Sequence, residues 1–239
     1  MKKILLIAVV ALLAIMNLNA QETVVKPYLR FNELPNLLNC LPPHPAFNSP
    51  EFADDVLRYQ WGKRQRADAD RLEVALHDSP WDLDSLFSVF SEAFGMKISR
   101  ENTPEIWKML ETSIVTIDTI RKAPKNHYKR ERPFEYYGEN VLPIEDERWL
   151  RGEGSYPSGH TLRGTLVALL LIEVNPENAD AIFRRGWDYG DSRIILGAHW
   201  HSDVEASRAA ASIGYAVLQT SDDFRAQMEK AKAEFAKKK

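Results

Sequence analysis

One stretch of the chain decides its fold: SGHTLRGTLVALLLIEV, from Ser158 to Val174. A serine is a preferred residue at the start of a helix, and the apolar residues that follow Ser158 occupy nearly every face of that helix. A helix that is apolar all round lies inside a protein core. This stretch therefore predicts a central buried helix.

Signals for the start of further helices recur on both sides of this stretch. Serine, threonine or asparagine followed by proline and an early acid is typical of a first helical turn. Such signals stand at four places in the chain. One segment begins at Ser49-Pro50-Glu51 and runs toward His77, and another begins at Ser79-Pro80 and ends at Gly95. Two more begin at Thr103-Pro104-Glu105 and at Asn175-Pro176-Glu177. Ser202 and Glu205 form a capping-box pattern that starts another helix. Because no segment alternates apolar and polar residues as a strand does, the sequence predicts an all-α fold, a single compact helical domain.

The first fifty residues have a different character. Met1 to Ala20 places two lysines before an apolar run from Ile4 to Met16 and a short polar end, which is the layout of a secretory signal peptide. We expect cleavage after Ala20, export, and a mature domain of residues 21–239. The apolar run is shorter than the roughly 20 residues that span a bilayer, so no membrane association is expected after cleavage. Six prolines between Pro27 and Pro50 predict an irregular arm over the domain.

Charge and cysteine content exclude some functions. The formal net charge is −3, and it becomes −5 once the leader with its two lysines is removed. An acidic chain offers no electrostatic reason to bind nucleic acid. Cys40 is the only cysteine, so no intramolecular disulfide can form, and we expect an inert, at least partly buried thiol.

Three short stretches contain most of the residues suited to chemistry. They are Lys125 to Pro133, Gly154 to Thr161 and Ser192 to Asp203. Taken singly, each has an ordinary structural explanation: a solvated basic face, a turn before a helix, and a hydrogen bond between His199 and Asp203 across one turn. In order, they read Lys-x6-Arg-Pro, then Pro-Ser-Gly-His, then Ser-Arg-x5-His-x3-Asp.

With these three motifs the chain resembles the type 2 phosphatidic acid phosphatase superfamily, and within it the class A bacterial non-specific acid phosphatases. The likeness continues through Leu41-Pro42-Pro43, Gly62-Lys63-Arg64 and Lys230 to Phe235. The resemblance implies a periplasmic or secreted acid phosphatase that uses no metal and no other cofactor. It also implies small phosphomonoester substrates, such as nucleotides, aryl phosphates and sugar phosphates, and a homo-oligomer.

The resemblance assigns phosphate binding to Lys125, Arg132, Arg193, Ser158 and Gly159. Attack on a phosphomonoester spreads negative charge over three oxygens, which cationic side chains can stabilise. The arginines offer planar donor pairs, and the start of the helix at Ser158 and Gly159 offers free backbone N–H groups. Vanadate, which mimics the phosphoryl transition state, should inhibit.

The remaining roles are also implied by the resemblance. His199 attacks phosphorus and forms a phosphohistidine, Asp203 holds the proton on its other ring nitrogen, and His160 protonates the leaving group and then activates water. If Ser202 starts a helix, His199 lies just before it and Asp203 in its first turn. His199 must begin neutral and His160 charged, so we expect a rate maximum on the acid side of neutral. An alcohol that reaches the phosphohistidine would compete with water, which gives a phosphotransferase side activity.

Four further functions fit parts of the pattern. His199-x-His201-x-Asp203 matches the opening of a metal-hydrolase motif, although Val204 stands where that motif has another histidine. A vanadate-dependent haloperoxidase, a lipid phosphatase and a catalytically silent phosphate-binding protein would each share some of these residues. Leu196 and Ile114 depart from the class A pattern, at a cysteine and an acidic position. Tyr136, Tyr137, Trp200 and the proline-rich arm are candidates for a leaving-group wall.

Overall fold

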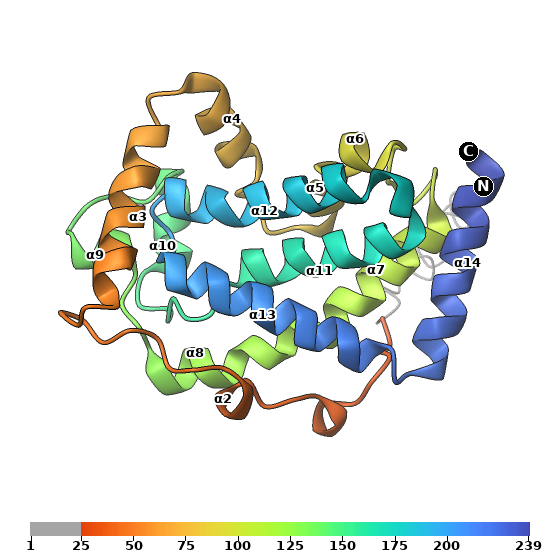
Figure 1. The fold of residues 1–239 in the computed structure, drawn as a ribbon, viewed down its shortest axis with the longest axis horizontal. Coiled ribbons are helices and arrows are strands. Elements are labelled where there is room, and N and C mark those ends of the chain that lie inside the picture. Colours follow the sequence, from red (N-terminus) through yellow and green to blue (C-terminus); the bar gives the residue numbers. More distant parts are fainter. Residues whose placement is uncertain (1–24) are drawn as a thin grey trace, which may run out of the picture.

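The computed structural model describes residues 25–239, and the predicted signal peptide, Met1 to Ala20, lies outside this part of the chain (Figure 1). Residues 25–239 form helices and loops without a strand, which confirms the all-α prediction. The α-helices are α2 (Leu37–Cys40), α3 (Phe52–Gln65), α4 (Ala69–His77), α5 (Leu83–Ser88), α6 (Ser91–Phe94), α7 (Pro104–Ile117), α8 (Lys122–Tyr128), α9 (Pro133–Tyr136), α10 (Glu147–Leu150), α11 (Gly159–Val174), α12 (Ala179–Ile195), α13 (His201–Leu218) and α14 (Asp222–Lys238). The 3₁₀ helices are η1 (Phe31–Glu33), η2 (Asp118–Arg121), η3 (Ile144–Asp146) and η4 (Pro176–Asn178).

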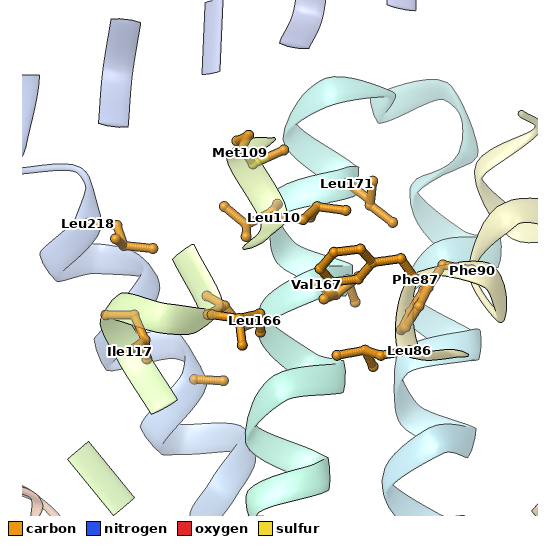
Figure 2. Close-up of a cluster of buried hydrophobic side chains, with 14 of the residues drawn as sticks. Leu86, Phe87, Phe90, Met109, Leu110, Ile117, Leu166, Val167, Leu171 and Leu218 are labelled. Atoms are coloured by element: carbon orange, nitrogen blue, oxygen red, sulfur yellow. The ribbon is translucent and has the colours of Figure 1, made fainter. Parts of the chain in front are cut away.

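The predicted central helix is α11. Ser158 is its N-cap residue, and its hydroxyl oxygen accepts the Thr161 backbone N–H at 3.3 Å. Helix α11 lies between α12 and α13 and also packs against α7 and α14 (Figure 1). Leu166 and Val167 are fully buried, and they belong to the same hydrophobic cluster as Leu110 of α7 and Phe87 of α5 (Figure 2). The prediction of a buried central helix is confirmed.

Two glycines allow α11 and α12 to pack closely. A Cβ atom on Gly164 would lie 2.4 Å from the Tyr189 ring, and one on Gly186 would lie 2.7 Å from the Cβ of Ala168. Such distances are shorter than any non-bonded contact between carbon atoms allows. This close packing brings Arg193, near the end of α12, to the start of α11.

Two predicted segments are each divided into two helices. The segment toward His77 breaks between α3 and α4, where the Asp68 carboxylate caps α4 by accepting the Arg71 N–H at 3.2 Å. The segment after Ser79 begins as a helix only at α5, because Asp82 is the N-cap residue. It ends after α6 at Gly95, whose φ of 81° is in the left-handed region that favours glycine.

The capping box predicted at Ser202 and Glu205 is wrong by two residues. Helix α13 has Trp200 as its N-cap residue, and the Asp203 carboxylate accepts the Trp200 N–H at 2.8 Å. Asp203 lies at the third helical position, which is where a capping box places its acid. His199 therefore lies just before α13 and Asp203 in its first turn, as expected.

The proline-rich arm lies over the domain as predicted, irregular apart from η1 and α2. Leu37 is fully buried, α2 packs against α8, and the Tyr156 hydroxyl donates to the Pro42 carbonyl at 2.6 Å. Cys40 is exposed, which corrects the expectation of a buried thiol, because it lies on the outer side of the short helix α2. In residues 25–239 no helix combines the length and apolar character needed to cross a membrane.

Candidate active site

A pocket of about 530 Å³ lies where the start of α11, the end of α12 and the start of α13 come together. Its charged lining consists of four basic and two acidic side chains, which are Arg121, Lys125, Arg132, Arg193, Asp146 and Glu153. His160 and His199 also line the pocket. The excess of positive charge and the start of α11 both favour an anion here. The volume is sufficient for a phosphate group with part of its ester.

Lys125 and Arg132 come from the first motif. Lys125 lies in α8, is 6 % exposed, and its ammonium group donates to the Gly154 carbonyl. A Cβ on Gly154 would lie 2.7 Å from the Lys125 carbonyl oxygen, so only glycine fits there. Arg132 precedes α9, and its Nε donates to the Leu150 and Glu153 carbonyls at 3.1 and 3.0 Å. Its Nη1 donates to the Ala198 carbonyl at 2.8 Å, so backbone acceptors fix the guanidinium.

Arg193 is fully buried in the last turn of α12. Its Nη1 donates to the Ser79 hydroxyl at 3.2 Å. Its Nε and Nη2 find no hydrogen-bond acceptor among the described residues, although Arg193 lines the pocket. Since a buried donor without a partner is unfavourable, these two N–H groups are suited to a pair of anionic oxygens.

His199 lies in the turn between α12 and α13 and is 2 % exposed. Its Nε2 is 3.1 Å from Arg132 Nη1, and its Nδ1 is 3.4 Å from an Asp203 carboxylate oxygen. A guanidinium can only donate, so Nε2 must carry the lone pair and Nδ1 the proton. This tautomer directs an unprotonated nitrogen toward the basic side chains of the pocket.

Burial and neighbouring charges shift the ionisation of these groups. Burial, followed by the charges of Arg132, Lys125 and Arg193, holds the pKa of His199 well below its usual value. Burial, followed by the charge of Arg132, lowers the pKa of Lys125 to about 7. The pocket thus keeps His199 neutral and weakens the hold of Lys125 on its proton, because both groups are buried and positive charges are crowded together.

His160 lies in the first turn of α11 on another side of the same pocket. Its Nε2 is 2.9 Å from the Ser79 carbonyl, which only accepts, so Nε2 carries a proton and Nδ1 is left for a ligand. The Trp81 ring packs edge-on against the imidazole, with centroids 4.8 Å apart. Burial, followed by the charge of Arg193, holds the pKa of His160 well below its usual value.

Six of the eight residues expected at the site line the pocket: Lys125, Arg132, Gly159, His160, Arg193 and His199. The other two do not. Ser158 uses its hydroxyl to cap α11, and Asp203 lies behind His199, fully buried. Ser158 therefore supports the helix start instead of lining the pocket with its side chain, whereas Asp203 is placed to orient the His199 ring.

Several lining residues are not predicted from the sequence. Trp81 and Glu153 come from loops, Arg121 from η2 and Trp149 from the short helix α10, and Ser79 is expected only as a helix start. Arg121 adjoins the basic run before Lys125, and Glu153 directly precedes the second motif, so adjacency to the motifs is the one available signal. The two tryptophans have none, because only the fold brings them here.

The aromatic residues expected as a leaving-group wall lie elsewhere. Tyr136, Tyr137 and Trp200 are absent from the pocket lining. Trp200 is fully buried, and its indole N–H donates to the Glu131 carbonyl at 2.8 Å. The aromatic side chains of the pocket are Trp81 and Trp149, which are 42 % and 69 % exposed.

His201 does not share the pocket with His199. Its Nδ1 is 2.7 Å from an Asp54 oxygen and its Nε2 is 3.4 Å from a Glu205 oxygen. The hydrogen bond with Glu205, with Asp54 also contributing, raises the pKa of His201. Both ring nitrogens are engaged away from His199, so the two histidines do not form the ligand pair of the metal-hydrolase pattern.

The comparison with known proteins agrees with this geometry. Residues 107–225 match the PAP2 superfamily. The chain is 41 % identical over 213 residues to a non-specific acid phosphatase of Providencia stuartii, covering 89 % of this chain and 86 % of that protein. It is 38 % identical to a non-specific acid phosphatase of Salmonella typhimurium, covering 88 % and 84 %, and 37 % identical to an acid phosphatase of Zymomonas mobilis, covering 82 % and 74 %. With its three motifs gathered in one cationic pocket and these relatives matched along most of its length, the chain belongs to the PAP2 superfamily, among the non-specific acid phosphatases.

Proposed function

We propose that this acid phosphatase hydrolyses phosphomonoesters through a phosphohistidine formed on His199, without a metal ion. The observation that carries the proposal is the 3.1 Å contact of Arg132 Nη1 with His199 Nε2. It requires a lone pair on Nε2, and it brings a phosphate-binding cation to the atom that attacks. The Arg132 N–H that contacts Nε2 would donate to a phosphate oxygen once substrate enters, while the backbone acceptors keep the guanidinium in place.

In the first step the Nε2 lone pair forms a bond to phosphorus while the ester P–O bond breaks. Lys125, Arg132 and Arg193 stabilise the negative charge on the three non-bridging oxygens, together with the backbone N–H groups at the start of α11. These groups supply the positive charge that a metal ion supplies in other phosphatases. Asp203 stabilises the His199 ring, which becomes cationic when Nε2 is phosphorylated.

His160 completes the cycle. Its Nδ1 protonates the departing alkoxide, and the neutral imidazole then removes a proton from the water that breaks the P–N bond. The low pKa of His160 favours the second of these roles. A bound phosphate dianion neutralises the charges that depress this pKa, and so favours the protonated form that the first role needs.

The wider properties follow from the same site and from the sequence. We infer a broad substrate range, because the phosphoryl group contacts the fixed cations while the ester group faces the open side of the pocket. An alcohol in place of water would give phosphotransfer. Export through Met1 to Ala20 to the periplasm or beyond, and assembly of identical subunits, remain predictions from the sequence and its resemblance.

The direct test measures hydrolysis of a chromogenic aryl phosphate in excess EDTA by the purified protein and by His199→Ala. We expect activity that survives chelation and is lost in the variant, together with acid-labile phosphate trapped on His199. His201→Ala is the matched control, since it removes a neighbouring histidine outside the pocket. Activity lost to EDTA and restored by zinc, or equal activity in His199→Ala, would overturn the mechanism.

A further inference from the structure

Behind the pocket, the structure joins Asp203 to two residues that are not fixed positions of any of the three motifs. Arg130 lies in the loop between α8 and α9, and Asp55 lies in the first turn of α3. Arg130 Nη1 donates to one Asp203 oxygen at 2.6 Å, and Arg130 Nη2 donates to an Asp55 oxygen at 2.7 Å. The side chains are between 0 % and 1 % exposed, so this row of charges has no contact with solvent.

The two oxygens of the Asp203 carboxylate have different partners. Oδ1 accepts from Arg130, while Oδ2 accepts the Trp200 N–H at 2.8 Å and faces His199 Nδ1 at 3.4 Å. Because the Arg130 bond fixes Oδ1, the carboxylate cannot rotate to present another arrangement to the ring. The direction of Asp203 toward His199 therefore depends on where Arg130 is held.

Asp55 holds Arg130 and the start of α13 together. Besides the Arg130 bond, Asp55 accepts the Ser202 backbone N–H at 2.7 Å and the Ser202 hydroxyl at 2.6 Å. Arg130 Nη1 also lies 2.7 Å from that hydroxyl. Asp55 lies 147 positions before Ser202 in the chain. Its carboxylate thus fixes the position of the turn that contains His199 relative to Arg130.

Charge gives the arrangement a further consequence. A buried carboxylate without a cationic partner is strongly disfavoured in its ionised form. Arg130 supplies a cationic partner to the buried Asp203 behind His199. When phosphorylation makes the ring cationic, the positive charges of Arg130 and His199 balance the negative charges of Asp55 and Asp203.

We propose that Arg130 and Asp55 are positioning residues for the nucleophile, acting through Asp203 to fix the tautomer and orientation of His199. The inference rests on the proposed phosphohistidine function. It predicts that changes at either residue slow phosphorylation of His199 without weakening substrate binding. A merely structural role would reduce the amount of folded protein and leave the turnover of the folded fraction unchanged.

The test uses the full chain, purified as wild type, Arg130→Met, Arg130→Lys and Asp55→Asn. We expect kcat per folded molecule to fall about 10- to 100-fold in Arg130→Met and Asp55→Asn, by analogy with the outer partners that orient metal-binding histidines, with KM unchanged. Arg130→Lys, which keeps the charge but cannot bridge both carboxylates in the same plane, should recover part of the loss. The ¹⁵N shifts of the His199 ring should change from one tautomer to a mixture in the slow variants.

Arg208→Met is the matched control, because Arg208 is also buried between two acids, Asp191 and Glu205, on α13 but outside the pocket. It should retain wild-type kcat and a single His199 tautomer. If the folded Arg130 and Asp55 variants behave like Arg208→Met, the inference is wrong. Activity that persists in His199→Ala would instead refute the proposed function, and if Arg130→Met does not fold, the two conservative variants decide the question.

Discussion

The Glu153 carboxylate lies 3.2 Å from the Arg132 guanidinium, inside the group of cations that is suited to phosphate. It is also 3.7 Å from Arg121 and 3.9 Å from Lys125, and its side chain is 46 % exposed. Glu153 thus places a carboxylate among three positive side chains of the pocket. A phosphate that enters must displace this carboxylate or accept its repulsion.

Removing the charge of Glu153 should tighten the binding of anions. For Glu153→Gln we expect the inhibition constant of inorganic phosphate at pH 6 to fall about 2- to 5-fold, since a half-exposed charge contributes up to about 1 kcal/mol. Glu145→Gln removes an exposed charge of η3 that is outside the pocket, and it serves as control. A higher inhibition constant in Glu153→Gln would mean that Glu153 mainly holds Arg132 in place.

The lowered pKa of Lys125 should appear in the pH dependence of anion binding. A bound anion favours the ammonium form, so affinity must fall as pH rises through the Lys125 pKa of about 7. Sulfate does not itself titrate near neutral pH, so its inhibition constant should rise, by up to about tenfold per pH unit above 7. Lys125→Arg keeps its charge and should abolish most of that slope. An equal slope in the two proteins would contradict the assignment.

How far the sequence can predict the fold depends on whether the signals are local. The helices at Ser158 and Thr103 begin where their N-cap and proline signals place them. The breaks between α3 and α4 and between α5 and α6 contain no proline or glycine, so they are not predicted, although Asp68 stands in place as a cap. The predicted start of α13 is wrong because Ser202, an apparent N-cap, donates to Asp55, a partner that only the fold supplies.

The same distinction applies to the pocket. His199, Arg132 and Lys125 are in short motifs whose spacing is visible along the chain. Trp81 reaches the pocket from a loop and Trp149 from the short helix α10, and no spacing along the chain could indicate this. Arg130 lies within the first motif, but its role depends on two carboxylates more than seventy positions away on opposite sides in sequence.

Trp149 is placed to contact the leaving group of aromatic substrates. It lines the pocket, is 69 % exposed, and has the aromatic face that aryl esters can stack on. Trp149→Ala should raise KM for an aryl phosphate about 2- to 10-fold and leave KM for glycerol phosphate nearly unchanged. Trp187→Ala, an exposed tryptophan of α12 outside this pocket, is the control. Equal changes for both substrates would show that Trp149 shapes the phosphate site itself.

The two pocket histidines should make the folded enzyme lose stability in acid. Burial holds the pKa of both His160 and His199 well below the ordinary value of 6.5. Below pH 6.5 the unfolded chain therefore binds protons that the folded enzyme does not, so the free energy of unfolding decreases as pH falls. Each histidine contributes up to about 1.4 kcal/mol per pH unit, until the pH drops below its folded pKa.

Urea unfolding between pH 7.5 and 5 measures this slope. The double variant with His160→Asn and His199→Asn should lose most of it, whereas His127→Asn, at an exposed histidine outside the pocket, is the control. Phosphate should reduce the slope in the wild type, because a bound anion favours protonation of His160 in the folded enzyme. A double variant as sensitive to acid as the wild type would assign the acid response to carboxylates elsewhere in the molecule.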